Sequence, residues 1–156
     1  MRVQIVAVGR LRPGPELSLI SDYLRRAERT GRSLGISEVS VIEVDDRKGG
    51  GKAAEAALIG KAIPKGAQTV ALDERGRTMT SPDFAARIGE WRDGGTGDLA
   101  FMIGGADGLD PALVADSDFK LSFGRMVWPH MLARVMLAEQ LYRATAILAG
   151  TPYHRE

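Results

Sequence analysis

Short apolar runs, each bounded by turn residues, recur along the chain and are typical of strands. Val3–Val8 is nearly continuous, as expected of a buried strand. In Glu38–Val44, apolar and polar residues alternate with the period of two that a pleated strand requires. The predicted strands are Val3–Val8, Glu38–Val44, Thr69–Asp73, Asp98–Ile103 and Phe119–Phe123.

Helical spacing or helix-end signals fill the segments between these strands. Ser81 and Asp110 are predicted N-caps, each followed by a proline, and Gly150 is predicted to end the last helix. The first helix has apolar residues at three- and four-residue intervals. The predicted helices cover residues 16–30, 52–63, a segment from Ser81, a short segment from Pro111 and the stretch from Pro129 to Ala149, whereas residues 74–80 are predicted to be a polar loop.

The regular alternation of strand and helix predicts one α/β domain over residues 1–156, with a mostly parallel sheet and helices on both faces. Ligands of such sheets bind outside the carboxyl ends of the strands. The loops that should carry chemistry therefore follow Val8, Val44, Asp73, Ile103 and Phe123.

Composition narrows the class of protein. Hydrophobic residues make up 44% of the 156, which is enough for a packed core. The chain has no cysteine, which excludes a disulfide scaffold and a thiolate nucleophile or metal site. The N-terminus lacks the pattern of a signal peptide, and no apolar run approaches the length of a membrane span. We expect a cytoplasmic protein without membrane contact.

The net charge of +1 says little about nucleic acid, but basic residues are grouped locally. Arg10 and Arg12 follow the first strand, four arginines lie between positions 25 and 32, and Arg47 and Lys48 precede a glycine run. These groups are either solvated faces or a divided basic surface for phosphates.

Common catalytic motifs are missing. The "GGGK" run at Gly49–Lys52 lacks the hydroxyl residue that a nucleotide-binding P-loop places after its lysine. "GRLRPG" stands where a dinucleotide fold needs G-x-G-x-x-G. No G-x-S-x-G elbow is present, and His130 and His154 lack the further ligands of a zinc site, so we expect no metal.

Three features remain. The glycines of "FMIGGADGLD" allow either close approach of a ligand or a simple turn. The last helix is apolar on more than one face, which hints at a dimer interface. The tail "TPYHRE" is either a frayed end or a group of side chains that stack on bases and bind phosphate.

The runs "VQIVAVGRLR", "IGGADG" and "LSFGRMVWPHMLARVMLAEQLYRATAILAGTPYHRE" closely resemble one family over nearly the whole chain. It is the family of bacterial SPOUT-class methyltransferases that modify N3 of a pseudouridine in large-subunit ribosomal RNA. The resemblance implies a C-terminal deep trefoil knot, S-adenosyl-L-methionine as cofactor and a homodimer with a shared active site. It also implies that the substrate is ribosomal RNA in the assembled ribosome. The alternative is a non-catalytic, RNA- or ribosome-binding homodimer of the same fold.

The resemblance also assigns residues. Many relatives carry a hydroxyl residue where Val127 stands. If backbone groups make the cofactor contacts there, little changes, and if a side-chain hydroxyl makes them, cofactor affinity should be lower here. The cofactor-binding residues would be Leu72, Gly104, Phe123, Gly124, Arg125, Met126, Val127 and Trp128. Candidates for catalysis are His130, His154 and Arg155, and candidates for RNA contact are Arg10, Arg12, Arg134, Tyr153, His154 and Arg155. On this interpretation Gly104 and Gly105 lack side chains so that the cofactor can lie against the backbone.

Overall fold

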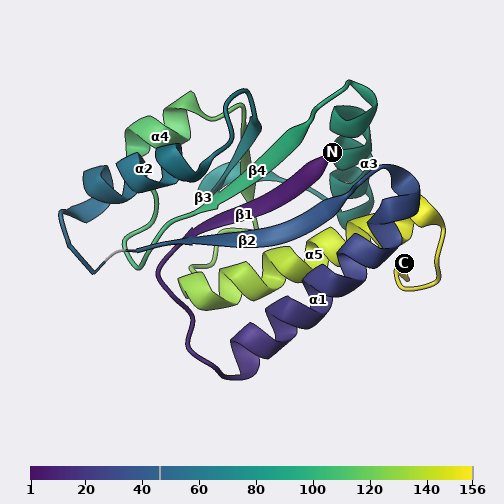
Figure 1. Ribbon diagram of the computed structural model, residues 1–156, viewed down its shortest axis with the longest axis horizontal. Helices are drawn as coiled ribbons and strands as arrows, with labels where there is room; N and C mark the ends of the chain where they lie inside the picture. The colour runs from purple at the N-terminus through teal and green to yellow at the C-terminus, as the bar shows by residue number, and fades with distance from the viewer. Residues whose placement is uncertain (46, 156) are drawn as a thin grey trace.

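Five strands form one parallel sheet in the computed structural model, which describes residues 1–45 and 47–155 (Figure 1). The order across the sheet is β2-β1-β4-β3-β5, and each neighbouring pair is parallel. The predicted α/β fold with a parallel sheet is therefore confirmed. The strands are β1 (Arg2–Val8), β2 (Glu38–Val44), β3 (Gln68–Thr78), β4 (Asp98–Ile103) and β5 (Phe119–Ser122).

Helices cover both faces of the sheet, as predicted (Figure 1). Side chains alternate along β1, so Ile5 belongs to the core beneath one helical layer and Val6 to the core beneath the other. One layer contains α1 (Pro15–Gly31), α3 (Ser81–Asp93) and α5 (His130–Ala149), with a short 3-10 turn (Arg32–Leu34) after α1, and the other contains α2 (Gly51–Ala62) and α4 (Pro111–Asp116).

The β3 strand is longer than predicted, and this is the main correction to the fold. Residues expected to form a polar loop continue β3 because they pair with β5. Leu121 of β5 lies opposite both Leu72 and Arg77, so residues 73–76 bulge out between two paired stretches of β3. Gly76 in this bulge lies against the β5 backbone, where an added Cβ would come within 2.7 Å of the Lys120 carbonyl carbon. A partner distant in sequence therefore decides this part of β3.

The predicted helix ends are mostly confirmed. Asp110 accepts a hydrogen bond from the Ala112 amide at 2.8 Å, and Gly150 ends α5 in the left-handed conformation. The cap of α3 is Thr80, whose hydroxyl accepts from the Asp83 amide at 3.2 Å, and Ser81 was the wrong choice. Ser81 is instead the first helical residue, and its hydroxyl donates to Gln140 on α5. In the part of the chain that is described, no helix has the length and apolar character that would let it span a membrane.

Candidate functional site

The residues expected to bind a cofactor leave the sheet at one edge. Ala71 of β3 pairs with Met102 of β4, and Leu72 pairs with Leu121 of β5. Because the strands are parallel, Gly104 and the segment that follows β5 lie at the carboxyl ends of β4 and β5, and Leu72 lies between them at the end of the first paired stretch of β3. This is the edge at which parallel α/β sheets bind ligands.

The segment 123–128 is anchored at its start and open at its end. The Ser122 hydroxyl lies 3.1 Å from the Gly124 amide, from which it accepts, and 3.1 Å from the carbonyl oxygens of Glu74 and Gly124. Further along, Met126 and Val127 are 73% and 82% exposed. Neighbouring apolar side chains this exposed form a surface that a ligand or another chain could cover.

The turn that contains Gly104 leaves no room for a side chain. A Cβ at this position would clash with the carbonyl group of Gly108, which is part of the same turn. The turn closes through a hydrogen bond of 3.0 Å from the Gly108 amide to the Gly105 carbonyl. The turn by itself therefore requires a glycine at position 104.

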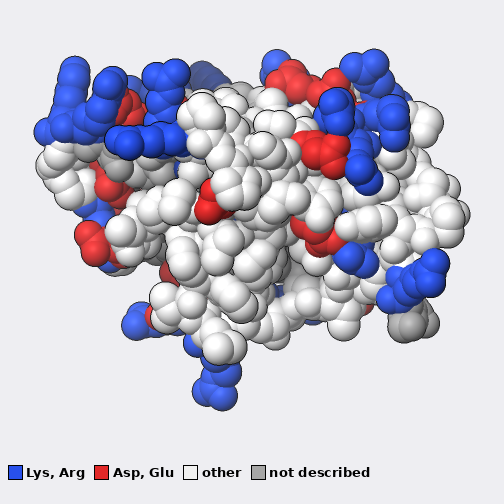
Figure 2. Space-filling model, turned by 90° about the horizontal axis from the view of Figure 1, so that it is seen from below, with Lys and Arg blue, Asp and Glu red and all other residues white. Residues whose placement is uncertain are grey.

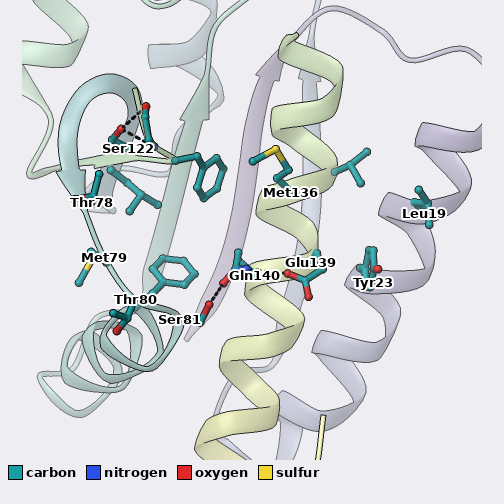
Figure 3. A pocket seen from close by; sticks show the side chains of 15 residues that line it. Leu19, Tyr23, Thr78, Met79, Thr80, Ser81, Ser122, Met136, Glu139 and Gln140 are labelled. Carbon is teal, nitrogen blue, oxygen red and sulfur yellow. Dashed lines mark hydrogen bonds between the residues drawn. The ribbon is translucent and has the colours of Figure 1, made fainter. Parts of the chain in front are cut away.

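An open groove of about 480 Å³ lies between α1, α5 and the chain that joins β3 to α3 (Figure 3). The predicted cofactor segment enters it only at Phe123 and Gly124. Glu139 extends from α5 on the side of α1, where Tyr23 lies (Figure 3). Sequence reasoning missed most of these residues, and its only signal was the second apolar face of α5. The groove is also lined by Leu19, Tyr23, Thr78, Met79, Thr80, Ser81, Phe84, Val135, Met136, Glu139 and Gln140.

The C-terminal tail packs onto α5 and is not a frayed end. The Tyr153 hydroxyl donates to Glu139 at 3.0 Å, and Glu139 also forms an ion pair with Arg143 one helical turn further along α5. The Tyr153 ring lies 4.8 Å from the Arg143 guanidinium and 4.4 Å from the Tyr142 ring. Burial, followed by the hydrogen bond to Glu139, raises the pKa of Tyr153 far above its ordinary value. Tyr153 is thus half-buried and held against α5.

The tail contacts fix the hydrogen-bonding state of His154. Arg143 Nη1 lies 3.2 Å from His154 Nδ1, and because a guanidinium can only donate, Nδ1 must accept. The ring proton of neutral His154 is then on Nε2, which is buried without a partner among the described residues. His130, at the start of α5, precedes Arg143 by 13 positions, a separation of about 20 Å along a helix. The two histidines of one chain cannot act on the same atom.

The basic residues expected to contact RNA separate into two groups. Arg10, Arg12 and Arg155 are exposed. Arg134 is only 2% exposed, and its guanidinium donates to Glu43 and to the carbonyls of Val8 and Gly9. In this conformation Arg134 cannot reach a phosphate, contrary to expectation. Within residues 1–45 and 47–155 no cluster of three or more histidine or acidic side chains is placed to hold a metal.

Comparison with known proteins gives full-length similarity. A family model described as a predicted SPOUT methyltransferase matches residues 1–154. A protein of Dinoroseobacter shibae named ribosomal RNA large subunit methyltransferase H is 69% identical over 155 residues, covering 99% of each chain. A protein of the same name from Paracoccus denitrificans is 64% identical over 156 residues, covering 100% of each. A solved structure of a probable methylase family protein from Haemophilus influenzae Rd KW20 is 13% identical, with a TM-score of 0.48, over 99% of this chain and 70% of that one.

Proposed function

This chain belongs to the SPOUT methyltransferase family, and from that premise we propose that it methylates N3 of a pseudouridine in large-subunit ribosomal RNA. The family match confirms the resemblance seen in the sequence motifs. The target atom, N3 of a pseudouridine, is part of the proposal. The observation that carries the proposal is the 69% identity, over 99% of both chains, to a relative named ribosomal RNA large subunit methyltransferase H. The whole chain acts as a single domain.

The cofactor of the proposed reaction is S-adenosyl-L-methionine, which when bound supplies a methyl group on a sulfonium. Leu72, Gly104 and the segment 123–128 would hold it at the carboxyl edge of β3, β4 and β5. The fit rests on the exposed apolar side chains of Met126 and Val127 and on the fixed backbone at Ser122 and Gly124. Side chains of this kind suit an adenine ring and a thioether chain. With valine at position 127, polar contacts there fall to backbone groups.

The proton on N3 must leave during the transfer, and negative charge then develops on the imide. Arg155, which is exposed, is suited to stabilise that charge, and His154 beside it, held through Nδ1 by Arg143, is the second candidate. His130 is the first residue of α5, far from the C-terminal tail, and is the candidate to accept the N3 proton.

These roles require two chains, because His130 lies about 20 Å along α5 from Arg143, the residue that contacts His154 in the same chain. We therefore propose a homodimer in which one subunit supplies His130 and its partner the tail. Figure 2, which views the side of α1 and α5, supports such an interface, with a broad uncharged middle and basic groups at the edges. The exposed large apolar residues on or next to these helices are Leu19, Met126, Val127, Trp128, Met131 and Leu132.

RNA binding is assigned to Arg10 and Arg12 in the loop after β1 and to the tail residues Tyr153, His154 and Arg155. The net charge of +1 predicts weak non-specific binding to RNA. Specificity then depends on the shape of the assembled ribosome, which places the site of action in the cytoplasm. Arg134 is not included, because it is buried.

We also propose that β5 passes through the bulge of β3 to give a C-terminal trefoil knot. Gly76 lies against the β5 backbone, and the Ser122 hydroxyl lies within hydrogen-bond distance of the Glu74 carbonyl in the same bulge. A stable domain fused to the C-terminus should slow refolding, because that end must pass through the loop. Unchanged refolding rates would count against the threading.

The decisive experiment measures methyl transfer from labelled S-adenosylmethionine to intact ribosomes that lack the modification, with naked ribosomal RNA in parallel. Label in large-subunit RNA from ribosomes, located by mass spectrometry at N3 of a pseudouridine, supports the proposal. Label on a uridine would correct the target. A folded dimer that binds ribosomes but transfers no label would favour the non-catalytic alternative.

A further inference from the structure

Arg134 joins three elements beside the predicted RNA-binding loop. Its Nη1 donates to Glu43 Oε2 on β2 at 2.8 Å, and its Nη2 donates to the carbonyls of Val8 and Gly9 at 3.2 and 3.1 Å. The same oxygen of Glu43 accepts from the Leu11 amide at 2.7 Å. The Arg134–Glu43 pair therefore fixes the backbone of the loop after β1 at two points, Gly9 and Leu11.

These polar contacts lie beside a gap in the packing of the loop. Leu11 packs against the core, but it also lines a cavity of about 210 Å³ that is bordered by Leu17 and by the Arg134–Glu43 pair itself. Apolar contacts at this place are therefore incomplete, and the hydrogen bonds contribute to the order of the loop. Arg134 is 2% exposed and Glu43 32%, and the low local dielectric strengthens bonds formed there.

The loop so held carries two exposed arginines. Arg10 and Arg12 flank Leu11, so fixing the Leu11 amide restrains the backbone from which both side chains extend. Ordering a loop before it binds removes part of the entropy cost of association. We infer that Arg134 and Glu43 are positioning residues that preorganise the loop at Arg10 and Arg12 for ribosomal RNA. This inference rests on the proposed function.

The first test replaces Glu43 and measures the KM for ribosomes. Glu43→Ala should raise that KM roughly two- to tenfold, the factor for one net hydrogen bond, and leave the Kd for S-adenosylmethionine unchanged. Glu43→Gln keeps an oxygen that can accept from the Leu11 amide, so its KM for ribosomes should stay close to that of the wild type. Asp98→Asn is the matched control. It weakens the Arg2–Asp98 ion pair at the amino ends of β1 and β4, away from the loop after β1, and should leave the KM unchanged.

A double-mutant comparison distinguishes the proposed positioning role of Glu43 from a purely structural one. In a chain that already carries Arg10→Ala and Arg12→Ala, Glu43→Ala should have no further effect on the KM. An effect of the same size in that background would overturn the inference, as would an unchanged KM in Glu43→Ala alone. If Glu43→Ala does not fold, because it leaves the Arg134 charge buried without its partner, Arg134→Met is judged by the same criteria.

Hydrogen exchange at the Leu11 amide gives a readout that does not depend on activity. Exchange should become at least roughly tenfold faster in Glu43→Ala and stay slow in Glu43→Gln, because the amide loses its acceptor only in the first variant. Equal exchange in wild type and Glu43→Ala would refute the anchoring. A wild-type protein that methylates no RNA would refute the proposed function alone, and affinity for ribosomes would then replace the KM in this test.

Discussion

Replacing Gly76 with alanine tests the closest contact between β3 and β5. The added Cβ would lie 2.7 Å from the Lys120 carbonyl carbon, 2.8 Å from that of Leu121 and 2.8 Å from the Lys120 oxygen. All three atoms belong to the backbone of β5, so no side chain can rotate away to relieve the clash. Gly76 does not have a positive φ, so the cost is steric and not conformational.

The magnitude follows from the cost of overpacking a tight site, about 1–3 kcal/mol. In a domain of this size each kcal/mol lowers the Tm by about 2–4 °C, so Gly76→Ala should melt about 2–12 °C below wild type. The assay is calorimetry together with urea unfolding at neutral pH. Both should report a lower free energy of unfolding for the variant.

Gly60→Ala is the matched control because it makes the same chemical change where there is room. Gly60 lies within α2, and a Cβ there would meet nothing within 4 Å. Alanine at this helical position should stabilise the protein by about 0.5–1 kcal/mol. A Gly76→Ala protein as stable as wild type, alongside a stabilised Gly60→Ala, would refute the proximity of the β3 bulge to β5.

Other contacts give further predictions. The folded-state pKa of Tyr153 is raised, so its contribution to stability is complete below pH 10.0 and is lost at higher pH. Urea titrations from pH 8 to 11 should therefore show a free energy of unfolding that falls above pH 10.0, and less steeply in Tyr153→Phe. The side-chain hydrogen bond from Arg47 lowers the pKa of Asp45, so Arg47→Ala should move the midpoint of its NMR titration upward toward 3.8. Solvent screens these exposed groups, so the shift and the accompanying change in Tm should both be small. Leu132→Glu places a charge on the proposed interface and should convert the dimer to a monomer in light scattering, whereas an unchanged mass would exclude this residue from the interface.

Local sequence patterns determined most of the secondary structure. β2 and β4 have the predicted bounds, because each is a short stretch rich in apolar residues that is ended by turn residues. The caps at Asp110 and Gly150 were predictable for the same reason, since a cap interacts with its own helix within a few residues. The family resemblance also came from sequence alone, and it carried the expected cofactor edge at Leu72 and Gly104.

Only the tertiary structure decided features that depend on distant partners. The polar residues of β3 after Leu72 continue the strand because β5 pairs with them, and no local pattern records that pairing. Arg134 has the sequence appearance of a surface helix residue, yet it is buried because α5 places it beside the end of β1 and Glu43. The sequence determined which segments become strands and helices, because those choices depend on near neighbours. The fold determined that Arg134 is buried and that glycine is required at position 76 beside β5, because both roles depend on atoms brought together only by folding.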